Sequence, residues 1–438
     1  MLFASTNASC PPCPLDDAVN RCVAADGGMF MPQVLPHIPQ AFFNNISEMT
    51  LADIAYVVAT TLLGDDVPAA ELKSITADSF AYEAPLKELG DNHYVLELFH
   101  GPTLTFKDYG ARFMARLMRY LDRRSGNVRR NVLVATTGNT GSAAANGLFR
   151  LEGISVSVLY PKGYLSKSQT AQFTALGENI HPIEVAGNVE DCKRLVQQAI
   201  SDESMQNYHL TGANSINVAR ILPQIAFTMY AYSRLKALGV KNAEAAMYSM
   251  PCGNCSNLVA AVMAKRMGVP GGRLVAATNA NDQLRVLMSG AEGGPRHCPV
   301  KTFAPSIDMS YPSGWPRLSS LYDGKPELMR REIICAPAVS DELIADTVTD
   351  LRRRFGYTID PHGAVAYAAA EACRESGVPV VSFATGHPAK QLDIMTRITG
   401  AAIELPVQLT RFMSLRRHSS IIPPTLPALR KHLLNLNN

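Results

Sequence analysis

The segment NVLVATTGNTGSAAANGLF, residues 131–149, joins an apolar run, a polar loop and a stretch of small residues. The run Val132 to Thr136 is short and rich in β-branched residues, which favours a β-strand. The loop Thr136 to Ser142 contains glycine and hydroxyl side chains, and Ala143 to Leu148 predicts a helix of small residues. This unit of strand, loop and helix is typical of an α/β fold.

The same succession recurs along the chain after residue 131. Strands are predicted at four further runs, namely Ile154 to Leu159, Met247 to Met250, Leu274 to Thr278 and Val380 to Phe383. Helices are predicted at Leu51 to Leu63, Val189 to Ile200, Asn257 to Met267 and Ser340 to Phe355. In the last of these, one buried face is predicted with a 4-3-4 spacing, formed by Ile344, Val348, Leu351 and Phe355. Strands that alternate with helices predict a mostly parallel sheet with helices on both faces, and ligands at the carboxyl ends of its strands.

Length and composition exclude several classes of protein. The chain has 438 residues, so two or three domains are expected. Hydrophobic residues make up 47% and charged residues 18%, which is the balance of a folded globular protein and excludes disorder as the main state. The net charge of +3 gives no broad basic field, so we expect small-molecule partners and no nucleic acid.

Targeting and cysteine usage point to a cytoplasmic protein without a membrane partner. The start MLFASTNASCPPCP lacks a cationic segment followed by a long apolar one, and apolar runs such as Leu258 to Ala264 are too short to span a membrane. Nine cysteines are spread over the whole chain, which does not resemble a secreted disulfide framework. Reduced thiols are therefore expected.

Two polar loops each follow a predicted strand and precede a predicted helix. The loop Thr136 to Ser142 fits an anion or carboxylate site at a helix N-terminus, and it equally fits an ordinary capped turn. It matches neither the dinucleotide nor the triphosphate-binding glycine motif. In the loop Pro251 to Asn257, a phosphate cradle fits the position before a helix.

The second loop also allows a different interpretation. Cys252 and Cys255 form one Cys-x-x-Cys pair, and Cys10 and Cys13 form another, so a tetrathiolate zinc site or a dithiol redox site is an alternative. The separation of more than two hundred residues is unlike a zinc ribbon. We therefore predict no metal.

Two further segments carry side chains suited to chemistry. Lys107 begins an amphipathic helical segment beside aromatic residues, where removal from water would lower the pKa of its amine toward that of a nucleophile or base. A lone lysine is most often a surface charge, and only the two polar loops described above favour the functional interpretation. The segment Phe383 to Lys390 offers a hydroxyl, an imidazole and an ammonium at a strand end, although it also fits a plain turn and helix start. His362, which follows Asp360 and Pro361, is interpreted first as a helix-start residue.

Taken together, the motifs closely resemble those of the threonine synthase family of fold-type II pyridoxal-phosphate enzymes. The motifs in chain order are ADGGMFMP (25–32), HGPTLTFKDYGARFM (100–114), TTGNTGSAA (136–144), ANSINVARILPQ (213–224), GNCSN (253–257), PSIDMSYPSGWPR (305–317) and TGHPAK (385–390). The resemblance implies two mostly parallel α/β domains with the active site between them, plus an N-terminal domain. The implied ranges are 1–95 for the N-terminal domain, 96–130 and 220–438 for the large cofactor-binding domain, and 131–219 for the small domain.

The resemblance implies pyridoxal 5'-phosphate as cofactor and assigns roles to individual residues. Lys107 would hold the cofactor as a Schiff base and then act as catalytic base and acid. The cofactor phosphate would lie in the loop formed by Gly253, Asn254, Cys255, Ser256 and Asn257. Asn139 would lie near the phenolic oxygen of the cofactor, and the Thr385 hydroxyl would face the pyridine nitrogen. A neutral hydroxyl there leaves the ring less protonated than a carboxylate would, so transamination need not be favoured.

The implied reaction is the last step of threonine biosynthesis, a carbon–oxygen lyase reaction that converts O-phospho-L-homoserine and water into L-threonine and phosphate. Thr136, Thr137 and Thr140 would lie near the substrate carboxylate. The leaving phosphate needs cationic or N–H donors, for which the motif positions are Asn214, Asn217, Arg220 and Lys390. The expected assembly is a monomer or a homodimer.

Two departures from the family pattern keep alternatives open. Asn139 replaces an acidic residue, and Cys255 replaces an aromatic one. A related phospholyase that releases 2-oxobutyrate, ammonia and phosphate is one alternative, and a non-catalytic pyridoxal-phosphate-binding protein is another.

Overall fold

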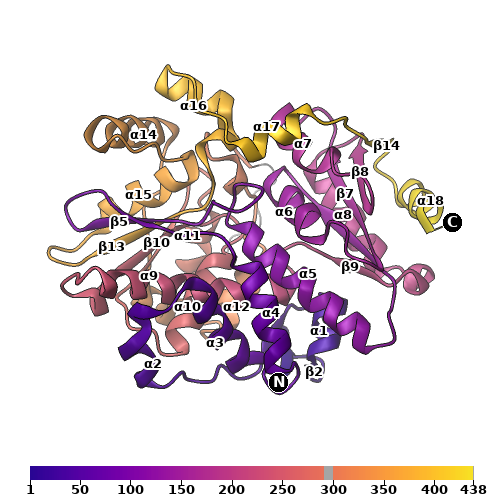
Figure 1. Cartoon of the computed structure of the whole chain (residues 1–438), viewed down its shortest axis with the longest axis horizontal. Coiled ribbons are helices and arrows are strands. Elements are labelled where there is room, and N and C mark those ends of the chain that lie inside the picture. The colour runs from indigo at the N-terminus through magenta and orange to yellow at the C-terminus, as the bar shows by residue number, and fades with distance from the viewer. Residues whose placement is uncertain (291–298, 438) are drawn as a thin grey trace.

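The computed structural model describes residues 1–290 and 299–437, and the largest sheet in them has six strands, three of which, β5, β13 and β10, are labelled on the left of Figure 1. Within these residues its strand order is β12-β11-β10-β13-β5-β4. Neighbouring strands are parallel except at the edge, where β4 runs antiparallel to β5. The strands are Ile333–Cys335 (β12), Leu274–Ala277 (β11), Met247–Pro251 (β10), Val380–Ala384 (β13), His93–Glu97 (β5) and Leu86–Glu88 (β4).

A second sheet, entirely parallel, has the order β14-β8-β7-β6-β9 in the described part of the chain. Its strands are Ser420–Ile422 (β14), Ile180–Val185 (β8), Ile154–Pro161 (β7), Arg130–Ala135 (β6) and Leu210–Gly212 (β9). A small antiparallel sheet near the N-terminus contains Leu2–Ser5 (β1), Cys13–Pro14 (β2) and Phe30–Pro32 (β3).

Helices cover both sheets. Those of the N-terminal part are Leu15–Arg21 (α1), Gln40–Asn45 (α2), Leu51–Leu63 (α3) and Ala69–Ser79 (α4). Of the helices that follow, eight are Lys107–Arg124 (α5), Asn139–Leu148 (α6), Lys167–Thr174 (α7), Val189–Ser201 (α8), Ile225–Ala237 (α9), Ser256–Arg266 (α10), Asp341–Phe355 (α14) and Pro361–Cys373 (α15). The others are Gln283–Met288 (α11), Trp315–Ser320 (α12), Pro326–Glu332 (α13), Leu392–Thr399 (α16), Val407–Ser414 (α17) and Leu426–Asn437 (α18).

Short 3₁₀ helices connect these elements. They are Ile46–Glu48 (η1), Glu203–Tyr208 (η2), Val218–Arg220 (η3), Leu222–Gln224 (η4), Ala243–Ala245 (η5), Pro305–Ile307 (η6) and Pro388–Gln391 (η7).

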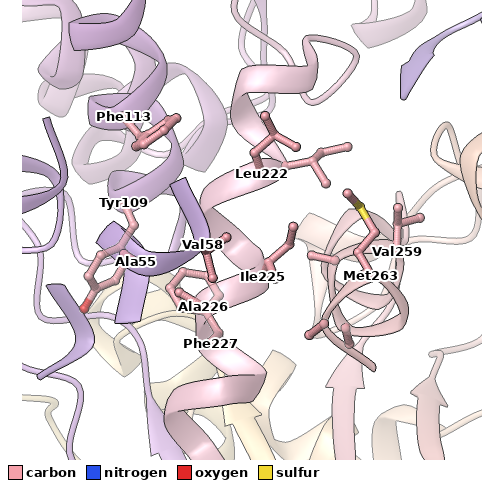
Figure 2. Close-up of a cluster of buried hydrophobic side chains, with 14 of the residues drawn as sticks. Ala55, Val58, Tyr109, Phe113, Leu222, Ile225, Ala226, Phe227, Val259 and Met263 are labelled. Carbon is pink, nitrogen blue, oxygen red and sulfur yellow. The ribbon is translucent and has the colours of Figure 1, made fainter. Parts of the chain in front are cut away.

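A buried apolar cluster anchors the helix that begins with Lys107. Figure 2 shows side chains of α3, α5, α9 and α10 in one group, among them Val58, Phe113, Phe227 and Met263. These four side chains are at most 2% exposed, so each contributes close to its full hydrophobic transfer free energy. The cluster therefore joins the N-terminal helix α3 to α9 and α10, and Tyr109 of α5 joins it through an edge-to-face ring contact with Phe227 at 5.3 Å.

The strands predicted from the sequence are confirmed. Each of the five predicted runs corresponds to an observed strand, namely β6, β7, β10, β11 and β13, with ends that differ by at most two residues. The fold class is confirmed as well, since both sheets are mostly parallel and carry helices. One helix differs, because α6 begins at Asn139, four residues before the predicted start at Ala143. The polar loop therefore ends as the first turn of a helix.

One predicted core position is wrong. Ile344, Val348 and Leu351 are buried in α14, but Phe355 is 36% exposed. Phe355 is the last residue of the helix, and Gly356 follows it in a left-handed conformation with φ of 64°. The chain turns away there, so the final position of the 4-3-4 pattern lies at the surface.

The domain boundaries remain a prediction, and the C-terminal segment crosses between the two sheets. The range 220–438 is assigned above to the large domain, yet β14 within it pairs with β8 of the second sheet. Three residues of strand give too short a pattern to indicate from sequence which sheet they join.

Among the helices of residues 1–290 and 299–437, none combines the length and the apolar character that a membrane span requires.

Candidate active site

Three neighbouring strands of the larger sheet lead into one cluster of loops. The strands β5, β13 and β10 are adjacent and parallel, so their carboxyl ends lie at the same edge. The loops that follow them span residues 98–106, 385–387 and 252–255. Two of these loops bond directly, since the Phe106 N–H donates to the Thr385 carbonyl at 3.0 Å. Segments far apart in the sequence are thereby held side by side.

A cavity lies where these loops meet the start of α6. Its wall contains residues of both sheets' loops, together with η6 and the start of α15. The lining residues are Thr105, Phe106, Lys107, Asn139, Pro251, Gly253, Asn254, Asn257, Ser306, Ile307, His362, Thr385 and Gly386. Five of the motifs singled out in the sequence thus contribute to one cavity.

Lys107 is the first residue of α5 and lines this cavity. Its side chain is half-buried, and this partial removal from water lowers the pKa of the amine to about 8. The positive charge of Arg220 lowers the pKa further in the same direction. An amine with such a pKa is available both as a nucleophile and as a proton acceptor near neutral pH.

The loop before α10 has the form of an anion cradle. Cys255, the N-cap residue of α10, adopts a left-handed conformation with φ of 54°. Gly253 lies against η6 so closely that a Cβ there would be 2.7 Å from the Cα of Ile307. Among the described residues, the backbone N–H groups of Gly253, Asn254 and Cys255 donate to no protein acceptor. Free N–H groups at a helix N-terminus favour a phosphate.

The polar side chains of this loop shape it from within. The Asn254 carboxamide oxygen accepts from the Ser256 N–H at 3.1 Å and hydroxyl at 2.7 Å, and its nitrogen donates to Ser215 at 2.8 Å. The Asn257 nitrogen donates to the Pro251 carbonyl at 3.0 Å. These side chains fix the backbone of the loop, and the backbone presents the donors.

The first turn of α6 brings Asn139 into the cavity wall. The Thr136 hydroxyl oxygen accepts from the Gly138 N–H at 2.9 Å and the Gly141 N–H at 2.8 Å, which shapes the turn. The Asn139 nitrogen donates to the Ser306 hydroxyl at 3.0 Å. Thr137 and Thr140 flank this turn and are half-buried; neither belongs to the cavity wall.

Two buried cations, Arg220 and Lys390, lie close to the buried carboxylate of Asp108 next to the cavity. The pKa of Arg220 is lowered to about 10 and that of Lys390 to about 7, in both cases mainly because burial disfavours the charged form. Asp108 opposes both shifts, and burial raises its own pKa. With Lys107 included, positive groups exceed negative ones, which favours an anionic ligand.

Asn214 and Asn217 lie near this region but use their side chains internally. The Asn214 amide bonds the backbone N–H and carbonyl of Ala135, at 3.2 and 2.9 Å. The Asn217 nitrogen donates to the Val19 carbonyl at 2.9 Å, and its oxygen accepts from the Ala219 N–H at 3.0 Å. Both side chains therefore position backbone.

The cysteine pairs are not brought together. Cys13 lies in the small N-terminal sheet, whereas Cys252 and Cys255 are buried beyond β10. Burial raises the pKa of Cys255 to about 12, so its thiol is protonated. Within residues 1–290 and 299–437, no group of three or more His, Cys, Asp or Glu side chains could hold a metal ion.

Three residues of the site region carry no role in the sequence-based assignment. Gln172 on α7 accepts a hydrogen bond from the Lys390 ammonium, and its nitrogen lies 3.4 Å from the Thr103 carbonyl. Ser306 and His362 both line the cavity. Gln172 has no motif around it that signals a site, whereas Ser306 belongs to the PSIDMSYPSGWPR motif and His362 follows an Asp-Pro pair. Those two sequence features could have indicated that Ser306 and His362 lie at the site.

Comparisons with protein families agree with the motifs. Residues 77–386 match the family described as pyridoxal-phosphate dependent enzyme. Residues 2–80 match the family described as threonine synthase N terminus, and residues 363–433 match the one described as threonine synthase, C-terminal. The three matches together span nearly the whole chain.

Individual proteins that are similar to this chain are also named threonine synthase. Threonine synthase of Serratia marcescens is 34% identical over 420 residues, covering 96% of each chain, and that of Escherichia coli is 32% identical over 419 residues, covering 95% of this chain and 96% of the relative. The crystal structure of the Escherichia coli enzyme superposes with a TM-score of 0.91, at 32% identity over 100% of both chains. A pyridoxal-phosphate-bound threonine synthase from Brucella melitensis gives a TM-score of 0.91, at 30% identity over 99% of both chains.

The lowered pKa of Lys107 predicts that its amine reacts with acylating reagents at a lower pH than an exposed lysine does. Because the folded protein disfavours its ammonium form, the acylation rate of Lys107 is expected to reach half of its maximum near pH 8. Arg220→Met is expected to move this midpoint to higher pH, because it removes a positive charge. Competitive acylation of protein dialysed against hydroxylamine, followed by peptide mass spectrometry, measures the midpoint, with the exposed Lys241 as internal reference. A midpoint near the ordinary lysine value of 10.5 would contradict the assignment.

Proposed function

The chain belongs to the threonine synthase family of pyridoxal-phosphate-dependent enzymes, and from this premise we propose that it converts O-phospho-L-homoserine and water into L-threonine and phosphate. It is a pyridoxal-phosphate-dependent lyase of threonine biosynthesis. The observation that carries the specific substrate is the surplus of buried cations beside Lys107. The phospholyase and the non-catalytic alternatives are not favoured, because relatives over 95% or more of the chain are threonine synthases.

The residues of the cavity fit pyridoxal phosphate. Lys107 offers an amine of lowered pKa for the covalent link, and the N–H groups of the loop Gly253 to Asn257 would hold the phosphate of the cofactor. Asn139 would face the phenolic oxygen, and the Thr385 hydroxyl the pyridine nitrogen. A Cβ at Gly253 would push η6 away, so the glycine keeps the cradle in place. When bound, the cofactor supplies an electron sink for charge left by deprotonated substrate carbons.

We assign proton transfer to the Lys107 amine. Near pH 8 comparable amounts of its charged and neutral forms exist, so little free energy is lost when its Nζ takes up a proton from the substrate α-carbon or returns one. The position at the start of α5, anchored by the apolar cluster of Figure 2, holds that nitrogen at the cavity wall. Fixed geometry converts proton transfer into an intramolecular step.

We assign the substrate phosphate to Lys390 and Arg220. A phosphate dianion bound beside Lys390 raises the pKa of that amine and so favours its charged form, which in turn stabilises the leaving group. Asp108 alone does not balance the cations around it. Asn214 and Asn217 shape the backbone near this pocket, since their amides are already bonded within the protein.

We place the substrate carboxylate at the first turn of α6. Thr136 already accepts two N–H groups, so its remaining hydroxyl hydrogen is available to donate. Thr137 and Thr140 offer further hydroxyl groups at the same helix N-terminus, where negative charge is favoured. This would place the carboxylate on the side of the cavity formed by the second sheet, and the cofactor phosphate on the side formed by the larger sheet.

Incubation of the purified protein with O-phospho-L-homoserine tests the proposed function. We expect threonine and phosphate in equal amounts, identified by separating the amino-acid products and assaying free phosphate. Phosphate accompanied by 2-oxobutyrate and ammonia instead of threonine would identify a phospholyase. A protein that keeps its chromophore but releases no phosphate would be a binding protein.

Lys390→Met tests the phosphate site. Loss of one charged hydrogen bond, worth about 1.5–3 kcal/mol, is expected to lower kcat/KM for O-phospho-L-homoserine by about tenfold to a hundredfold. The exposed Lys87→Met is the matched control and should retain the parent value. Steady-state kinetics measures both variants, and circular dichroism verifies that each is folded. An unchanged kcat/KM in folded Lys390→Met would remove Lys390 from the site.

A further inference from the structure

We propose that His362 is a positioning residue, which holds Ser306 by its backbone and through it sets the orientation of the Asn139 amide. This inference rests on the proposed function in one respect, that Asn139 faces the cofactor. His362, Ser306 and Asn139 come from three separate segments, yet all three line the cavity that contains Lys107.

Asp360 fixes His362 at the start of α15. As the N-cap residue, Asp360 accepts from the Gly363 N–H at 2.9 Å, and its other oxygen lies 2.6 Å from Nδ1 of His362. Both side chains are buried, at 2% and 3% exposure. The imidazole therefore cannot swing away without leaving a buried carboxylate partly unpaired.

The second contact of His362 defines which ring nitrogen carries the proton. Nε2 accepts a hydrogen bond from the backbone N–H of Ser306 at 3.0 Å. A backbone N–H can only donate, so Nε2 must present a lone pair, and Nδ1 must carry the proton that it donates to Asp360. The ring thus acts as a neutral bridge between a carboxylate and a peptide group.

Ser306 passes this constraint to Asn139. Its hydroxyl accepts from the Asn139 nitrogen at 3.0 Å. The Asn139 carboxamide oxygen is buried and has no hydrogen-bond partner among the described residues, so Ser306 holds the amide from one side only. The second hydrogen of the same nitrogen remains available to an acceptor oxygen in the cavity. Without Ser306 the amide would be free to rotate.

The same short segment also supports the phosphate cradle. Ser306 lies in η6 beside Ile307, whose Cα sets the close approach at Gly253. The contact from His362 to the Ser306 backbone therefore fixes the peptide segment that touches both Asn139 and the glycine loop. A purely structural helix-start histidine would need only the bond to Asp360.

Two substitutions separate the contacts of His362. In His362→Asn the amide nitrogen can replace Nδ1 toward Asp360, but nothing reaches the Ser306 N–H. In His362→Gln the longer side chain can present an oxygen to that N–H. The structural bond is thus kept in the first variant, and the bridging bond in the second.

The readout is the pH midpoint of the visible absorbance of the holoenzyme. Loss of a donor to the phenolic oxygen makes that oxygen more basic, so His362→Asn should move the midpoint to higher pH by about one unit and lower kcat about tenfold. KM should change little, and His362→Gln should restore much of both values. His93→Asn is the matched control. His93 is also buried, with side-chain partners Glu371 at 2.5 Å and Ser382 at 2.8 Å, but it lies at the amino end of β5, whereas the cavity lies beyond the carboxyl ends of the strands.

Hydrogen exchange of cofactor-free protein tests the bridge separately. The peptide that contains Ser306 should exchange faster in His362→Asn than in the parent, and His362→Gln should slow it again. This result would stand even if the protein failed to make threonine, so the two failures are distinguishable. Exchange and absorbance that are unchanged in His362→Asn, or a His362→Gln variant as impaired as His362→Asn in both, would overturn the proposal.

Discussion

The withdrawal of one amine from water is the constraint on which the site depends. Lys107 begins a helix whose apolar face is buried against α4, α6 and the segment formed by η3 and η4, and its half-buried side chain lines the cavity. The resulting pKa of about 8 is a consequence of burial first and of Arg220 second. The fold stabilises this unfavourable placement through the large cluster behind the helix. Chemistry at the cavity and stability of the core are thereby coupled.

Arg220 and Lys390 are likewise charged groups placed away from water. Lys390 and Arg220 are buried beside a single carboxylate, an arrangement that is costly until an anion arrives. Binding energy from the substrate phosphate would relieve that cost and charge the amine that stabilises phosphate departure. Gln172, which accepts from Lys390, extends this network to α7 and so links the two sheets at the cavity.

Much of the fold could be predicted because local patterns express it. Short runs dominated by apolar residues marked the central strands β6, β7, β10, β11 and β13, which are almost entirely buried because helices cover both faces of their sheets. β14 and the exposed end of α14 at Phe355 escaped prediction, since three residues or a helix terminus give no period to detect. The site loops were identifiable as polar interruptions between a strand and a helix.

The site was predictable only as far as its motifs extend. Lys107, Asn139, Gly253 and Thr385 line one cavity, although their roles toward the cofactor stay predictions. The sequence could not indicate that His362 reaches Ser306, because this contact joins residues 56 positions apart in different elements. Nor could it indicate that the Asn214 and Asn217 amides are used up by backbone groups.

Reduction of the purified holoenzyme with borohydride, followed by peptide mapping, tests the central claim most directly. Reduction makes the link between cofactor and lysine permanent, and mass spectrometry locates the modified residue. The structure predicts a single pyridoxyl group on Lys107. Modification of Lys390 or another lysine, or no modification after incubation with pyridoxal phosphate, would contradict the account.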